Sequence, residues 1–276
     1  MLQAFLDMER RSYWLDSEVF RHSLKAFIGG QDMADKESLF ADLVTASRIL
    51  ANEGICDAFG HISIRNPQNP ERFFLARAVA PELVTRDDIM EFELDGTPLN
   101  DDRKPFLERF IHGSLLEMRE DVNSVVHSHS RGVIPFGVTG MPLRPLLHSC
   151  GVLGKDIPVW DAGDAFGDTN LLIGNIAMGR DFAASLGAGR AALMRGHGST
   201  VVGRSIREAV YTAVYLDVNA QLQAVSMQMG PVKFLTDGEI SLIQSRLADA
   251  KPGEGYDRAW QYWARRAGIA AGDPVP

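Results

Sequence analysis

The sequence predicts a single three-layer α/β/α domain around a central, mostly antiparallel sheet. Short apolar or β-branched segments alternate with helical patterns from residue 37 to about residue 227. No internal repeat, low-complexity tract or long linker divides this region. Such alternation favours helices packed on a sheet, and 276 residues suffice for a substantial core.

The first half of the chain begins with an expected helical arm and continues into helix and strands. Residues 1–35 carry apolar side chains at roughly helical spacing, as far as Gly29 and Gly30. A helix is expected from Glu37 to Glu53, and Gly54 would end it. Strands are expected at residues 61–65, 72–75 and 89–94, with Asp95-Gly96 as a hairpin turn after the last.

The second half continues the alternation. Pro105 is expected to open a helix that runs to about Glu117. Further strands are expected at residues 123–129, 159–160 and 191–193. A long helix from Glu208 to Met227 is expected to turn Val210, Val214, Leu216, Val218, Leu222 and Val225 inward. The main domain would span 36–235, followed by C-terminal helices and a polar tail at 236–276.

Composition narrows the class of protein. A formal charge of -8 argues against binding to nucleic acid or to anionic membranes, although a local cluster of cations can still bind an anionic substrate. The only cysteines, Cys56 and Cys150, form no CxxC pair, which favours a reducing compartment. Neither a signal peptide nor a membrane-length apolar run is visible, so we expect a cytoplasmic protein.

Three histidines have the spacing of metal ligands. His127 and His129 lie two residues apart at the end of an apolar strand, so both side chains point to the same face. His197 lies between Gly196 and Gly198, directly after another apolar strand. Each feature alone also fits a partly buried strand histidine or a turn histidine. Together they predict a site for one divalent ion.

Glu108 is the candidate carboxylate for this site. It falls in the first turn of the helix expected after Pro105, where the helix dipole favours an anion. A carboxylate beside three neutral imidazoles can bind the ion or act as acid and base. A solvated acid or a carboxylate that orients a histidine are the alternatives. The ligand set suits zinc, manganese, cobalt or iron without deciding among them.

The ordered set of motifs resembles the class II aldolase/adducin family. The matching segments are Phe59–Arg65, Glu108, Val125–His129 and Leu193–Gly198, and the likeness runs from about Glu37 to Gly230. The resemblance implies a nine-stranded type of antiparallel sheet and a homotetramer with active sites at subunit interfaces. It also implies one metal ion per subunit, held by His127, His129 and His197, with Glu108 as ligand or proton shuttle.

Several positions depart from the pattern of the family's sugar-phosphate aldolases. His61 follows Gly60 where the aldolases have asparagine, and Phe106-Leu107 stand where they have two serines. A phosphate-binding turn is replaced by Ala76–Pro81. Apolar side chains cannot replace hydrogen bonds to phosphate, so a phosphorylated sugar is not expected.

The aldolases also have a tyrosine after the histidine that His148 matches. Ser149 stands there in this chain, and the proton donor of an aldol cleavage is absent from its expected place. Tyr211 or Tyr215 of a neighbouring subunit are candidates to replace it.

The sequences of residues 80–85, 107–113 and 144–148 resemble those of a sub-branch of this family that contains dihydroxyphthalate-type decarboxylases. This resemblance implies a metal-dependent lyase that removes carbon dioxide from a small anionic hydroxylated aromatic acid. The alternatives are a retro-aldolase on a non-phosphorylated hydroxy-keto acid and a non-haem iron oxygenase on a hydroxyphenyl acid.

Four further residues are candidates for work on such a substrate. His61 and His148 are candidates to bind a substrate oxygen or to protonate the ring, with a structural role as the alternative for each. Arg77 is a candidate for substrate binding, because an arginine pairs well with a carboxylate, and a solvated loop arginine is the alternative. Tyr215 is a candidate as a tyrosine that a neighbouring subunit would supply. His112 lies four residues after Glu108 on the same helical face, and its expected role is to pack in the core or to support a residue that binds the metal.

Overall fold

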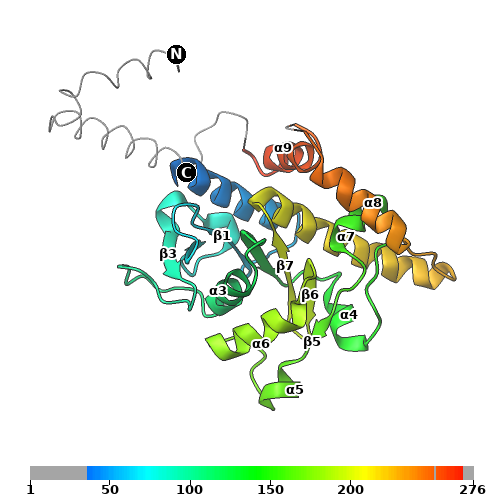
Figure 1. Ribbon diagram of the computed structural model, residues 1–276, viewed down its shortest axis with the longest axis horizontal. Helices are drawn as coiled ribbons and strands as arrows, with labels where there is room; N and C mark the ends of the chain where they lie inside the picture. Colours follow the sequence, from blue (N-terminus) through cyan, green and yellow to red (C-terminus); the bar gives the residue numbers. More distant parts are fainter. Residues whose placement is uncertain (1–35, 252, 270–276) are drawn as a thin grey trace, which may run out of the picture. The chain divides into compact units, whose positions relative to one another are not determined.

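A computed structural model describes residues 36–251 and 253–269 of the protein (Figure 1). The chain divides into two units, residues 1–41 and 42–276, and everything described below on the site lies in the second. Residues 36–41 of the first unit and 42–52 of the second are helical, which agrees with the helix expected from Glu37 to Glu53. The expected arm of residues 1–35 lies outside the described residues.

The second unit is built on a mixed sheet in the order β3-β2-β1-β4-β7-β6-β5, which has seven strands within the described residues. All neighbours pair antiparallel except β5 with β6. The expected α/β class with a mostly antiparallel sheet is therefore confirmed. The resemblance implied a sheet of the nine-stranded type, whereas the described residues form one of seven strands. The strands are β1 (His61–Arg65), β2 (Arg72–Ala76), β3 (Ile89–Glu93), β4 (Ser124–Ser128), β5 (Val159–Trp160), β6 (Ala191–Met194) and β7 (Gly198–Gly203).

Helices cover the two faces of the sheet. On one face, α3 (Arg109–Met118) and α6 (Ile176–Leu186) pack against each other and on the strands. On the other face, α7 (Ile206–Met229) packs along β4 and β7 (Figure 1). The remaining helices are α4 (Ile134–Thr139), α5 (Ala162–Phe166), α8 (Asp237–Ala248), α9 (Tyr256–Arg266) and the 3-10 turns η2 (Pro81–Leu83), η3 (Arg86–Asp88) and η4 (His148–Leu153).

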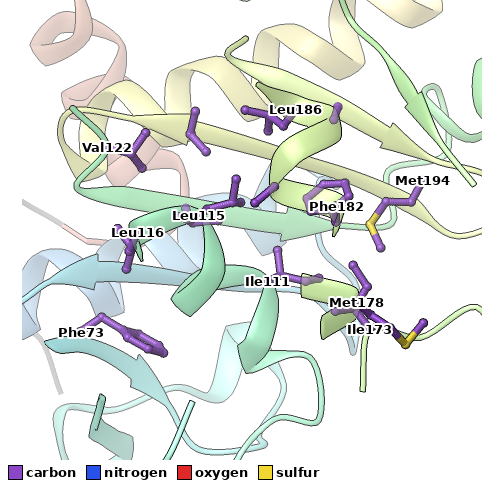
Figure 2. Close-up of a cluster of buried hydrophobic side chains, with 14 of the residues drawn as sticks. Phe73, Ile111, Leu115, Leu116, Val122, Ile173, Met178, Phe182, Leu186 and Met194 are labelled. Carbon is purple, nitrogen blue, oxygen red and sulfur yellow. The ribbon is translucent and has the colours of Figure 1, made fainter. Parts of the chain in front are cut away.

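The core that holds the site lies between the sheet and the pair of helices α3 and α6 (Figure 2). Ile111, Phe182 and Met194 are buried there together with Val125 of β4. The helices approach closely because glycines allow it: a Cβ on Gly179 would lie 2.6 Å from the Phe110 carbonyl oxygen. Burying such side chains contributes about 1.5–3 kcal/mol each, which fixes the layer from which Glu108 projects.

The structure differs from the sequence expectations at several helices. The helix expected from Pro105 begins at Arg109, with Glu108 in the N-cap position, because Pro105 forms a bridge with Arg77. Along α7, Leu222 and Val225 are exposed rather than turned inward. Gln223 is the last buried residue of this helix. No helix among the described residues is long and apolar enough to cross a membrane.

Two elements that build the sheet and the core around the site were not expected from the sequence. Strand β7 begins Gly-Ser-Thr, which lacks an apolar signal, yet all six of its residues are buried between β4 and β6. Helix α6 was missed although Asn175 caps it and Met178, Phe182 and Leu186 recur at helical spacing. That spacing and the cap are signals by which α6 could have been found.

Candidate metal centre

Strand β4 positions the first two histidines. Val125 and His127 share the face of β4 that turns towards α3, since residues two apart on a strand point to the same side. Across the sheet, His127 pairs with His61 of β1 and with Thr200 of β7. His127 is completely buried, and His129 follows directly after the strand as a half-buried residue. Ser128 turns to the opposite face, as the spacing predicted.

His197 lies in the tight turn between β6 and β7. Gly196 has φ of +66°, a conformation that glycine adopts without strain. Gly198 comes so close to β4 that a Cβ there would lie 2.2 Å from the Ser128 carbonyl oxygen. A glycine is therefore required at this position for β7 to approach β4. This approach places His197 beside His129.

Glu108 reaches the histidines from the start of α3. The residue is only 8% exposed, and its Oε1 accepts a hydrogen bond of 3.0 Å from the backbone N–H of Ile173. The other oxygen, Oε2, lies 3.4 Å from His127 Nε2 and 3.5 Å from His197 Nε2. The Ile173 N–H thus orients the carboxylate so that one oxygen faces the imidazoles.

The four side chains converge in the way that a single ion requires. His129 Nε2 lies 3.1 Å from His127 Nε2 and 3.0 Å from His197 Nε2, and all four ligand atoms are within 4.8 Å of one another. Ligands at about 2.0–2.1 Å from a tetrahedral zinc ion would be about 3.3 Å apart. The four contact distances between neighbouring ligand atoms, 3.0–3.5 Å, bracket that value, so the cluster fits a divalent metal ion.

The protonation states also suit metal binding. Burial, and then the neighbouring His127 and His197, lower the pKa of His129 to about 4. Burial acts to raise the pKa of Glu108, but His127 and His197 outweigh it and hold that pKa well below its ordinary value. The Nδ1 of His127 lies 3.1 Å from the Ser199 carbonyl oxygen, which accepts from Nδ1–H and leaves Nε2 as a free ligand atom.

Beside the cluster lie the ring of Phe106 and a second pair of histidines, His61 and His112. The His61 ring centroid lies 4.4 Å from that of Phe106 and 5.2 Å from that of His127. His61 Nδ1 is 2.6 Å from His112 Nε2. Burial, and then neighbouring imidazoles, lower the pKa of His112 to about 3 and that of His61 well below its ordinary value. Both rings are therefore uncharged at neutral pH.

The structure does not bring His148 and Tyr215 to the cluster of the same chain. They line a separate cavity of about 610 Å³ together with Tyr211, next to α9. Because α7, which carries both tyrosines, packs on the sheet face opposite α3, the sheet separates this cavity from Glu108. Arg77 donates from Nε to Asp88 Oδ1 over 2.6 Å, and its role with a substrate stays a prediction.

Sequence reasoning missed the backbone groups that orient the ligands and the partner of His112. The Ile173 N–H and the Ser199 carbonyl carry no signal in residue type, because every residue has them. His112, expected either to pack in the core or to support a residue of the site, bridges His61 and Ser63. Its four-residue spacing from Glu108 was the available signal.

Comparisons with known proteins identify a family and related chains. Residues 41–224 match the family described as Class II Aldolase and Adducin N-terminal domain. The chain is 35% identical over 242 residues to the protein named decarboxylase tropJ of Talaromyces stipitatus, covering 80% of this chain and 91% of that protein. It is 28% identical over 245 residues to a 3,4-dihydroxyphthalate decarboxylase of Arthrobacter keyseri, covering 83% of this chain and 93% of that protein.

A solved structure shares the fold. The L-fuculose 1-phosphate aldolase from Glaciozyma antarctica superposes with a TM-score of 0.67 at 25% identity, over 85% of this chain and 90% of that one. The family match covers well over half of the sequence, and the match to the Talaromyces protein spans most of both chains. The chain therefore belongs to the class II aldolase and adducin family.

Proposed function

We propose that the protein is a metal-dependent lyase that decarboxylates a hydroxylated aromatic carboxylic acid. The observation that carries this proposal is the pairing of the histidine and glutamate cluster with an apolar border. The Phe106 ring lies tilted against the His61 ring, and Leu107, directly before Glu108, is 49% exposed. An aromatic ring can pack on these side chains, whereas a phosphate group would find no hydrogen-bond donor on them. The names of the two relatives described above support the same chemistry.

Each residue of the cluster has a role that follows from its contacts. A bound zinc, manganese, cobalt or iron ion would supply a Lewis acid for the oxygen atoms of the substrate. His127, His129 and His197 would hold the ion through their converging Nε2 atoms. Glu108 would bind the ion or move a proton at Oε2, because Oε1 is held by the Ile173 N–H. Arg77 would pair with a carboxylate of the substrate.

The test is an anaerobic assay with defined metals. The chelated protein is reloaded separately with zinc, manganese, cobalt or ferrous iron and offered a panel of hydroxyphthalates and dihydroxybenzoates. We expect at least one metal form to release carbon dioxide and the decarboxylated phenol in equal amounts. Mass spectrometry of the phenol and a carbon dioxide electrode measure the two products.

Controls separate the proposed reaction from its alternatives. Chelator must abolish the release of carbon dioxide, and the metal must restore it. Turnover that starts only when oxygen reaches the iron form would contradict the lyase and indicate an oxygenase. Cleavage of a non-phosphorylated hydroxy-keto acid, with no release from any aromatic acid, would indicate a retro-aldolase.

We further propose that the active form is a homotetramer in which a second copy completes each site. His148 and Tyr215 line a cavity on the sheet face opposite the cluster's helix layer, so they can serve the cluster only in another chain. Tyr211 and Tyr215 lie with their ring centroids 4.5 Å apart, which provides phenol groups beside His148. Closed symmetry places the same two surfaces against each other at every interface.

Mixing two inactive variants tests this arrangement. The Glu108→Gln variant lacks a working metal cluster. The double variant His148→Ala/Tyr215→Phe keeps the cluster and lacks the groups that a second copy would contribute to it. After unfolding and refolding together, random pairing should leave about a quarter of the sites with both halves intact and restore that share of the activity. The mixture of Glu108→Gln with His127→Ala is the matched control and should stay inactive. Full activity of the double variant alone, or no recovery on mixing, would refute the shared site.

A further inference from the structure

The buried residues Ser63, His112 and His61 form an unbroken hydrogen-bonded row beside the candidate metal centre. Ser63 Oγ lies 2.6 Å from His112 Nδ1, and His112 Nε2 lies 2.6 Å from His61 Nδ1. Ser63 and His112 have no solvent exposure, and His61 is 7% exposed. The row runs from β1 to α3 and back to the residue of β1 that pairs with His127.

The direction of the hydrogen bonds follows from the serine. Within residues 36–251 and 253–269, His112 Nδ1 is the sole hydrogen-bond partner of Ser63 Oγ. A buried hydroxyl group that does not donate its proton leaves that proton without a hydrogen bond, which is unfavourable. Ser63 Oγ–H therefore donates to His112 Nδ1. His112 then carries its proton on Nε2.

The same reasoning passes to His61. His112 Nε2–H donates to His61 Nδ1, so a neutral His61 ring carries its own proton on Nε2. In the part of the chain that the structure describes, His61 Nε2 has no protein partner and is not one of the buried unpaired atoms. This N–H thus remains available beside Phe106 and His127.

We propose that Ser63 and His112 fix His61 as a neutral Nε2–H donor that binds an anionic oxygen of the substrate. His61 then acts as a catalytic hydrogen-bond donor, and Ser63 and His112 are positioning residues. The role of His61 towards the substrate rests on the proposed decarboxylase function, whereas the direction of the row does not. A base role for His61 is excluded in this arrangement, because Nε2 already carries the proton.

The direction of the row is tested by nuclear magnetic resonance on the zinc-loaded protein labelled with ¹⁵N-histidine. The His61 signals are identified by their loss in His61→Gln. We expect the pattern of a ring protonated at Nε2 and unprotonated at Nδ1. We also expect His112→Phe, which removes the donor but keeps a flat ring, to lose this pattern. A wild-type His61 protonated at Nδ1 would overturn the proposal, even if the His112 variant failed to fold.

The donor role is tested by comparing two variants of His61 in the decarboxylation assay. His61→Gln retains an N–H donor but cannot act as acid or base, whereas His61→Phe retains only the volume. We expect kcat to fall less than about tenfold in His61→Gln and about 10²–10³-fold in His61→Phe, the usual effect of losing one oxyanion donor. Equal losses in both variants, with zinc content unchanged, would show that His61 acts by proton transfer and would refute the donor role.

The two failures remain distinguishable. If no aromatic acid is decarboxylated but His61 is protonated at Nε2, the proposed function fails and the row stands. If the enzyme is active and His61 is protonated at Nδ1, only the row fails.

Discussion

Replacing His127 with alanine is expected to remove the metal ion and to abolish turnover. Its Nε2 lies 3.1 Å from His129 Nε2 and 3.4 Å from Glu108 Oε2. Without it, His129, His197 and Glu108 remain, and the carboxylate loses one of the two neighbours that stabilise its charge. We expect metal content below a tenth of the wild-type value and a loss of activity of about 10³-fold or more.

Metal content per subunit, measured by plasma mass spectrometry after gel filtration, checks this prediction. His148→Ala is the matched control, because His148 lines the separate cavity and should keep its metal. Since removing a buried ring also leaves a void, His127→Gln provides a less disruptive variant. Chelator should lower the melting temperature of the wild-type protein and leave that of His127→Ala unchanged. A His127→Ala protein with full metal content would exclude His127 as a ligand.

Replacing Glu108 with glutamine is expected to stop catalysis while much of the metal remains. Glutamine keeps the shape of the side chain and can still accept the Ile173 N–H bond at its carbonyl oxygen. It cannot accept and return a proton at the position of Oε2. Loss of a general acid or base lowers kcat by about 10²–10⁴-fold. The three histidines should still hold at least part of the metal.

The control for Glu108 lies on the same helix. Glu117 forms an exposed ion pair with Arg180, and Glu117→Gln should leave both metal content and kcat unchanged. The decisive comparison is kcat per bound metal ion, which corrects for any ion lost by the variant. Normal turnover per ion in Glu108→Gln would contradict the acid and base role and leave Glu108 at most a ligand.

Much of the fold was accessible from local patterns. The expected strands at 61–65, 72–75 and 89–94 correspond to β1, β2 and β3, because each alternates or clusters apolar residues between turn signals. Strand β7 could not be predicted from such a local pattern. Its polar start is buried only because β4 and β6 pair with it on both sides, and pairing is not a property of the segment itself.

The candidate site divides in the same way. The spacing of His127 and His129 determined that both imidazoles share one face, because side chains alternate along any strand. The sequence also presented Glu108 and His197 as candidates by their residue type and their neighbours. It could not show that all four ligand atoms lie within 4.8 Å, since that depends on strand pairing and helix packing.

Tertiary structure alone decided three features of this protein. The close approach at Gly198 brings His197 to His129, and the Ile173 N–H turns the Glu108 carboxylate towards the imidazoles. Packing of α3 on β1 joins His112 to Ser63 and His61. These contacts connect residues far apart in the chain, and they form only when burial of the core brings the layers together. The sequence by itself therefore determined which groups are available for chemistry, and the packed layers decided which of them meet.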